Sequence, residues 1–128
     1  MRPKPSSRVI AWVLKEPATE LFTTSITEAA MFYGIELLPQ GKRREGLLEA
    51  AEAMFAEDLA GRVFKFESDA ARFFAKIAAH RYALGRPISQ ADAQIAAIAQ
   101  MRGAKVATRN IADFTDCGIE VVDPWNGS

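Results

Sequence analysis

The sequence has 128 residues, 49% of them hydrophobic and 25% charged, which suits one globular domain with a sizeable core. Sixteen basic and sixteen acidic residues balance, so any nucleic-acid binding must come from local patches and not from a basic protein as a whole. The single cysteine excludes an intramolecular disulfide and a multi-cysteine zinc site and favours a reducing cytoplasm, and no apolar run is long enough to cross a membrane.

The first half of the sequence predicts alternating helices and strands. A helix is expected over residues 7–15 and a strand over residues 20–25, where β-branched and aromatic residues are concentrated. Ser25 is then placed as the N-cap of a helix, and the spacing of apolar residues over 43–60 predicts another helix that ends at Gly61. A first helix with no strand before it indicates that the sheet lacks its first strand in this chain.

The second half continues the same alternation. A helix that begins at Ser68 and ends at Gly85 is expected to turn Leu84 toward the core, and the next helix runs from the cap residue Ser89 to Gly103. The strands of this half are expected at residues 63–66, 104–108 and 119–122. Strands separated by helices predict an α/β fold, with a small parallel sheet covered by helices on both faces.

Polar residues gather where such a sheet places its chemistry. Asn110 and Asp113 follow directly after the strand at 104–108, and Asp92 lies in the first turn of the helix before it. Functional residues of parallel sheets lie just beyond the carboxyl ends of the strands. Carboxylates gathered there repel one another unless a divalent cation bridges them, and Mg²⁺ and Mn²⁺ prefer oxygen ligands.

The same acids also have a structural explanation as helix caps. Three pairs have the spacing of a capping box or a near relative of it: Ser25 with Glu28, Ser89 with Asp92, and Asn110 with Asp113. A cap contributes about 0.5–2 kcal/mol, and an acid in the first turn gains further from the helix dipole. The structural explanation is favoured for Glu28, whereas both explanations stay open for Asp92 and Asp113.

Other residues are weaker candidates for catalysis or for phosphate binding. His80 follows Ile77 on a helix face, where packing is favoured over catalysis. The candidate phosphate contacts are the basic residues Arg2, Lys4, Arg8, Lys42, Arg43, Arg44, Arg81 and Arg86. The run at 42–44 is typical of a solvated helix start.

Segments spread over the whole chain resemble one known family. They read TEAAMFYGIELLPQGKRR from Thr27, DAQIAAIA from Asp92, TRNIADF from Thr108 and VVDPW from Val121. In combination these segments resemble the PIN-domain toxins of the VapC type, especially the FitB-like branch. The resemblance implies a single PIN-like domain over residues 1–128, built as a three-layer α/β/α sandwich.

The resemblance also implies a function. It implies a Mg²⁺- or Mn²⁺-dependent endoribonuclease that acts on single-stranded or structured RNA. The protein would be the toxin of a type II toxin–antitoxin system: a cytoplasmic homodimer with no membrane association, held inactive by a small antitoxin.

Family positions can be assigned to this sequence. The third acid of the family falls on Asp92, the polar position after the last metal-site strand falls on Asn110, and Asp113 follows closely. All three are candidate catalytic residues, with Asp92 and Asp113 as the metal ligands. Thr108 and Arg109 are the candidate RNA-binding residues.

The sequence departs from the family in two places. Family members begin with an apolar strand that ends in Asp-Thr-Asn and supplies the first metal ligand, and this chain begins after that segment. The second family acid falls on Ala30, and Glu28 is displaced from it by about 200° around the helix.

We therefore expect the chain as written to be nearly inactive. The alternative function is a non-catalytic PIN-like module that binds its antitoxin or RNA. A receiver-like or nucleotide-binding domain is less favoured, because the sequence has no glycine-rich phosphate loop.

Overall fold

The computed structural model describes residues 22–108 and 110–123. The elements of that part are, in order, β1 (Thr23–Thr24), α2 (Ser25–Glu36), α3 (Lys42–Ala53), the π-helical turn η2 (Met54–Asp58), β2 (Val63–Phe64), the 3₁₀ turn η3 (Ser68–Ala70), α4 (Ala71–Ala83), α5 (Gln90–Arg102), β3 (Val106–Ala107), the 3₁₀ turn η4 (Ile111–Phe114) and β4 (Val121–Val122). The helix predicted over residues 7–15 lies outside the described residues. The chain divides into two compact units, one ending at Phe64 and the other beginning at Lys65.

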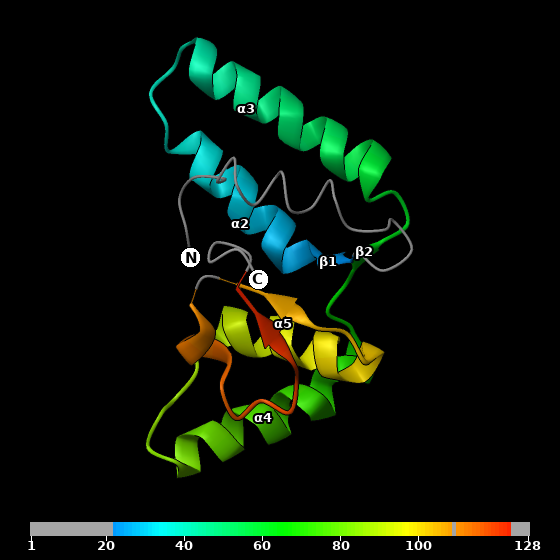
Figure 1. Cartoon of the computed structure of the whole chain (residues 1–128), viewed down its shortest axis with the longest axis vertical. Helices are drawn as coiled ribbons and strands as arrows, with labels where there is room; N and C mark the ends of the chain where they lie inside the picture. The colour runs from blue at the N-terminus through cyan, green and yellow to red at the C-terminus, as the bar shows by residue number, and fades with distance from the viewer. Residues whose placement is uncertain (1–21, 109, 124–128) are drawn as a thin grey trace. The chain divides into compact units, whose positions relative to one another are not determined.

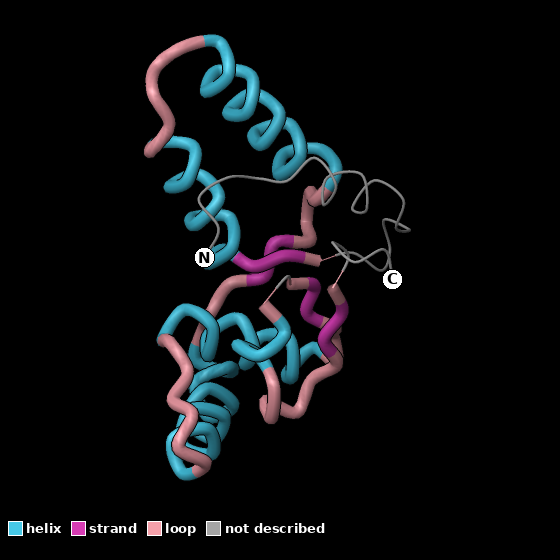
Figure 2. The backbone as a smooth tube through the Cα atoms, turned by 60° about the vertical axis from the view of Figure 1, so that its left-hand side comes forward, coloured by secondary structure: helices cyan, strands magenta, loops and turns pink. Residues whose placement is uncertain are grey.

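The strands form one short parallel pair in each unit, drawn in magenta in Figure 2. Thr23 lies opposite Val63 in the pair β1–β2, and Val106 lies opposite Val121 in the pair β3–β4. Parallel strands need a crossover connection, which α2 and α3 provide between β1 and β2. Helices alternating with parallel strands confirm the predicted α/β class, although each strand is shorter than its sequence pattern indicated.

In the first unit, β1 passes directly into α2. The N-cap of α2 is therefore Thr24, the last residue of the strand, whose Oγ1 accepts a hydrogen bond from the backbone N–H of Thr27 at 3.0 Å. The prediction that Ser25 is the cap was wrong by one residue. Figure 1 shows α2 and α3 side by side and running in opposite directions.

Aromatic contacts hold this first unit together. The ring of Phe32 on α2 packs against the buried ring of Phe55, with centroids 5.7 Å apart. Phe22 and Phe64, beside the paired strands, stack at 4.8 Å. Ile35 is fully buried in the same unit. The predicted helix over 43–60 is α3 followed by η2, and the π-helical turn contains the buried Phe55.

In the second unit, α5 packs against α4, and most of the buried residues of α5 are small. The buried residues of α5 are Ala93, Ala96, Ala97, Ile98 and Ala99. Short side chains at a contact allow two helices to approach closely. The helix ends at Gly103, as predicted from the sequence, and this glycine has a left-handed φ of 65°.

Helix α4 buries an unexpected side chain. Ile77 is buried as predicted, and Arg81, one turn later on the same face, is only 5% exposed. Leu84 is 47% exposed and His80 is also exposed, so the predictions that they pack into the core were wrong. His80 is turned by about 100° from Arg81 around the helix, and Leu84 lies beyond the last residue of α4 as its C-cap. None of the described helices is both long and apolar enough to span a membrane.

Candidate active site

The carboxyl end of β3 is fixed by main-chain hydrogen bonds. The N–H of Thr108 donates to the carbonyl of Val122 at 2.9 Å, which continues the pairing of β3 with β4 by one residue. The N–H of Asn110 then donates to Oγ1 of Thr108 at 3.0 Å, and the N–H of Asp113 donates to the carbonyl of Asn110 at 3.0 Å. The polar residues after β3 therefore form a folded turn directly beyond the strand pair.

Asn110 precedes the turn η4 as its N-cap residue. Its side chain makes no capping hydrogen bond, so the capping explanation for Asn110 and Asp113 is not supported by the geometry. Asp113 is exposed and Asn110 is half-buried. Arg109, predicted to bind RNA, lies outside the described residues.

The start of α5 carries the second part of the candidate site. Ser89 has extended backbone angles, and its Oγ accepts a hydrogen bond from the backbone N–H of Asp92 at 3.1 Å. The capping role predicted for Ser89 is confirmed. The half-buried Asp92 lies in the first turn of α5, where the helix dipole favours a carboxylate.

Asp92 and Asp113 are close enough for their charges to interact. Burial raises the pKa of Asp92 above its usual range, a hydrogen bond with the Ser89 side chain opposes the rise, and the Asp113 carboxylate adds to it. The positive charge of Arg81 also favours the ionised form of Asp92. Carboxylates from two separate segments thus interact electrostatically.

This arrangement fits a hydrated divalent cation. Among residues 22–108 and 110–123, no three His, Cys, Asp or Glu side chains group closely enough to enclose a metal ion. Mg²⁺, however, usually keeps several waters and is held by one or two carboxylates. A cation beside Asp92 and Asp113 would relieve the repulsion between them, and the amide oxygen of Asn110 offers a further ligand type. The metal-binding role of these residues stays a prediction.

The basic residues are in different environments. Arg81 is buried and donates to main-chain carbonyls, so it does not offer the phosphate contact considered for it. Arg86 is exposed and forms an ion pair with Asp116. In the first unit, Arg44 pairs with Glu36, and Lys42 is exposed at the start of α3.

The buried Arg81 was not recognised from the sequence as a residue of this region. Its guanidinium reaches the turn that carries Asp113, with Nη1 donating to the Asp113 carbonyl at 2.9 Å. The only signal in the sequence is spacing, because Arg81 lies four residues after the core residue Ile77 and therefore on the same helix face.

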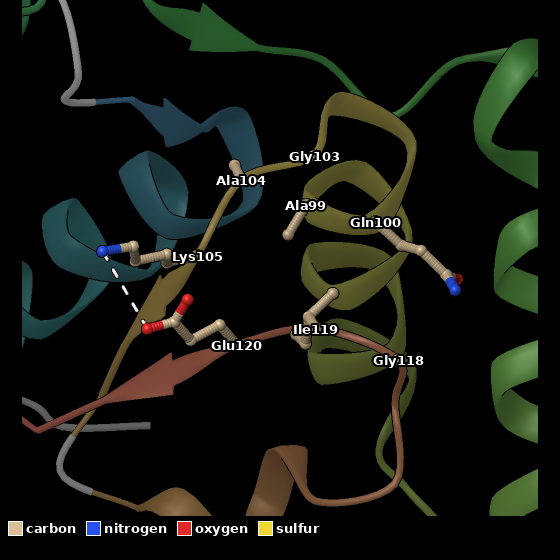
Figure 3. A pocket seen from close by; sticks show the side chains of 8 residues that line it. All are labelled: Ala99, Gln100, Gly103, Ala104, Lys105, Gly118, Ile119 and Glu120. Atoms are coloured by element: carbon tan, nitrogen blue, oxygen red, sulfur yellow. Dashed lines mark ion pairs between the residues drawn. The ribbon is translucent and has the colours of Figure 1, made fainter.

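A shallow depression of about 240 Å³ lies at the amino ends of the strands β3 and β4. Residues that precede each strand line it together with the end of α5, as Figure 3 shows. Lys105 and Glu120 face each other there, with Nζ and Oε2 3.9 Å apart. Both side chains are exposed, so this pair contributes little to stability, and the depression holds none of the predicted site residues.

Comparison with known proteins identifies the family. No family model matches the sequence. The chain is 35% identical over 122 residues to the VapC ribonuclease Y4jK of Sinorhizobium fredii, an alignment that covers 95% of this chain and 87% of that protein. It is 32% identical over 126 residues to Toxin FitB of Neisseria gonorrhoeae, covering 98% of this chain and 91% of the toxin.

The chain belongs to the VapC and FitB family of toxins. The fold agrees, because the structure of FitAB bound to the IR36 DNA fragment matches with a TM-score of 0.83 at 34% identity. That match covers 97% of this chain and 87% of the other. The VapC and FitB membership and the PIN-type α/β fold implied by the resemblance are therefore confirmed.

Proposed function

We propose that this VapC and FitB family member is a Mg²⁺- or Mn²⁺-dependent endoribonuclease toxin, with Asp92 and Asp113 as its metal ligands. The observation that supports the proposal most is that burial raises the pKa of Asp92 and that the carboxylate of Asp113, from a separate segment, adds to this rise. A relative named as a ribonuclease and another named as a toxin support the same function.

A divalent cation, if held by Asp92 and Asp113, would supply Lewis-acid chemistry for the cleavage of a phosphodiester. The chain's own residues have separate tasks. Asp92 and Asp113 hold the cation and fix its position relative to β3. Asn110 offers an amide that hydrogen-bonds to a water or a phosphate oxygen, and the hydroxyl of Thr108 keeps a proton to donate to the RNA backbone. Arg109 adds a guanidinium that suits phosphate.

The proposal includes partners and a location. The structure of FitAB contains a second component besides FitB, and we infer a small antitoxin partner for this chain by analogy. A homodimer and a cytoplasmic location belong to the same proposal. The lone Cys117 is buried as a free thiol, which is compatible with a reducing compartment.

The test is cleavage of fluorescent single-stranded RNA in the presence of Mn²⁺ or Mg²⁺. We expect little cleavage by the chain as written and a gain in Ala30→Glu, because Ala30 takes the place of the second family acid on α2. EDTA should abolish the gain. Adding Asp92→Asn to Ala30→Glu should also abolish the gain. The control Glu120→Gln, added in the same way, should not, because Glu120 is an exposed acid at the amino end of β4.

Two results would contradict this assignment. Metal-dependent cleavage that survives Asp92→Asn would show that the site lies elsewhere. Cleavage by the chain as written at the full rate of Ala30→Glu would show that the second acid is not needed.

A non-catalytic module is the second candidate function. It is favoured by Ala30 and by the lack of a third grouped carboxylate among the residues that the structure describes. This function predicts no cleavage of varied RNAs by Ala30→Glu, together with saturable binding of RNA or of a co-expressed antitoxin in fluorescence anisotropy. Metal-dependent cleavage by Ala30→Glu would exclude it.

A further inference from the structure

A buried arginine holds the turn that carries Asp113. The guanidinium of Arg81, on the last turn of α4, donates from Nη1 to the carbonyls of Asp113 at 2.9 Å and Thr115 at 3.2 Å. Its Nε donates to the carbonyl of Arg86 at 2.7 Å, and Nη1 also lies 3.7 Å from Sγ of Cys117. One side chain thus connects α4, the loop after it and the segment after η4.

Arg86 holds the same segment from the outside. Its Nη1 donates to Oγ1 of Thr115 at 3.3 Å, and its Nη2 pairs with the carboxylate of Asp116. Oγ1 of Thr115 in turn donates to the carbonyl of Ala112 at 3.1 Å. Asp116 has a φ of 60°, in the left-handed region, so the segment takes a conformation that needs support from its surroundings.

Apart from the contact with Sγ of Cys117, the hydrogen bonds given above for Arg81 go to main-chain carbonyls, and this matters for the site. A buried charge is costly unless it is hydrogen-bonded, and here carbonyl oxygens provide the partners. Asp113 is an exposed residue, and the hydrogen bond that Arg81 donates to it goes to its main-chain carbonyl. A planar guanidinium can reach several carbonyls at once, which a lysine ammonium on a flexible stem does less well.

We propose that Arg81 is the positioning residue of the candidate site: it fixes residues 113–117 so that the carboxylate of Asp113 stays beside that of Asp92. This inference rests on the proposed metal-binding function of the two acids. Arg81 does not touch the metal or the RNA in this proposal. It acts through the backbone that it holds, and its charge also favours the ionised form of Asp92.

The test compares Arg81→Gln, Arg81→Lys and Arg86→Gln with Arg72→Gln, a matched control at an exposed position on the same helix. Mn²⁺ affinity is measured by electron paramagnetic resonance on protein shown to be folded by circular dichroism. Loss of a group that orients a metal ligand typically weakens affinity about 10- to 100-fold, and we expect a loss in this range for Arg81→Gln. Arg81→Lys should recover part of it, Arg86→Gln should lose less, and Arg72→Gln should bind as the parent does.

Amide hydrogen exchange in the metal-free protein gives a second measurement, independent of metal. Arg81→Gln should speed exchange in residues 113–117 and leave the interior of α5 unchanged. Unchanged exchange in 113–117 would overturn the positioning role whatever the metal does, and so would unchanged Mn²⁺ affinity in folded Arg81→Gln and Arg81→Lys. Faster exchange in a protein whose parent binds no Mn²⁺ would support the hold on the turn and contradict the proposed function instead. If Arg81→Gln does not fold, Arg81→Lys gives the decision, with a smaller expected loss of Mn²⁺ affinity and a smaller rise in exchange.

Discussion

The capping role of Ser89 and the metal-binding role of Asp92 can be separated by two substitutions three residues apart. Ser89→Ala removes the oxygen that accepts the N–H of Asp92 at 3.1 Å, and the loss of such a cap costs about 1 kcal/mol. For a domain of this size that free energy lowers the melting temperature by roughly 3–5 °C. The Asp92 carboxylate remains and loses only its hydrogen bond with the Ser89 side chain, so the affinity for Mn²⁺ should fall far less than in Asp92→Asn.

Asp92→Asn should have the opposite effect. It keeps the backbone N–H that Ser89 accepts, and it removes a charge that burial and the Asp113 carboxylate both disfavour. The lost helix-dipole interaction offsets this gain by about 0.3–1 kcal/mol, so the stability of the metal-free protein should change little. The ability to bind Mn²⁺ should be lost.

Thermal unfolding with and without Mn²⁺ measures both effects. A ligand at 100 times its dissociation constant stabilises the folded state by about 2.7 kcal/mol. The parent and Ser89→Ala should both show a rise in melting temperature of roughly 8–13 °C under that condition. Asp92→Asn should show none. A full Mn²⁺-dependent rise in Asp92→Asn would refute the metal assignment, and an unchanged melting temperature of metal-free Ser89→Ala would refute the cap.

Three further predictions concern stability and reactivity. The pKa of Asp92 is raised in the folded state, so the folded protein keeps this proton to a higher pH than the unfolded chain does. The free energy of unfolding of the metal-free protein should therefore fall as pH rises from the usual aspartate pKa to the raised value. Urea titrations across the acid range should show this fall in the parent and not in Asp92→Asn. Gly103→Ala and Gly118→Ala should each lower the free energy of unfolding by about 1–2 kcal/mol, because both glycines have a left-handed φ. Gly118→Ala should lose at most about 1 kcal/mol more, since its new Cβ would lie 2.6 Å from the side-chain amide of Gln100, which can move. A much larger difference between the two variants in chemical denaturation would show that Gln100 cannot move. Burial raises the pKa of the Cys117 thiol, so iodoacetamide should label the native protein far more slowly than the urea-unfolded chain, and equal rates would contradict its burial.

Local signals in the sequence predicted most element boundaries. Ser89 and Gly103 bound α5 as predicted, because a cap hydroxyl and a left-handed glycine act within one turn of chain. The cap of α2 was misplaced to Ser25, since sequence does not show that β1 runs straight into the helix and leaves Thr24 with extended angles.

The candidate site was predictable only in part. The order of helix, strand and turn indicated Asp92, Asn110 and Asp113, and the family resemblance then assigned a family acid to Asp92. Arg81 was predicted as a candidate phosphate contact and not as a buried residue, because arginine is mostly exposed and its burial depends on carbonyls that lie about thirty residues further along the chain. Such a contact comes from tertiary packing and leaves little trace in local sequence.

Arg81 holds the turn through hydrogen bonds to main-chain carbonyls, and this has a consequence for sequence variation. A carbonyl oxygen is present in every amino acid, so the bonds to residues 113 and 115 do not depend on which side chains those positions carry. Related chains that keep the arginine can therefore change the exposed side chains of the turn, such as Ile111 and Ala112, without releasing its backbone. The surface next to the candidate site is thus open to evolutionary change of its chemistry while its geometry is retained.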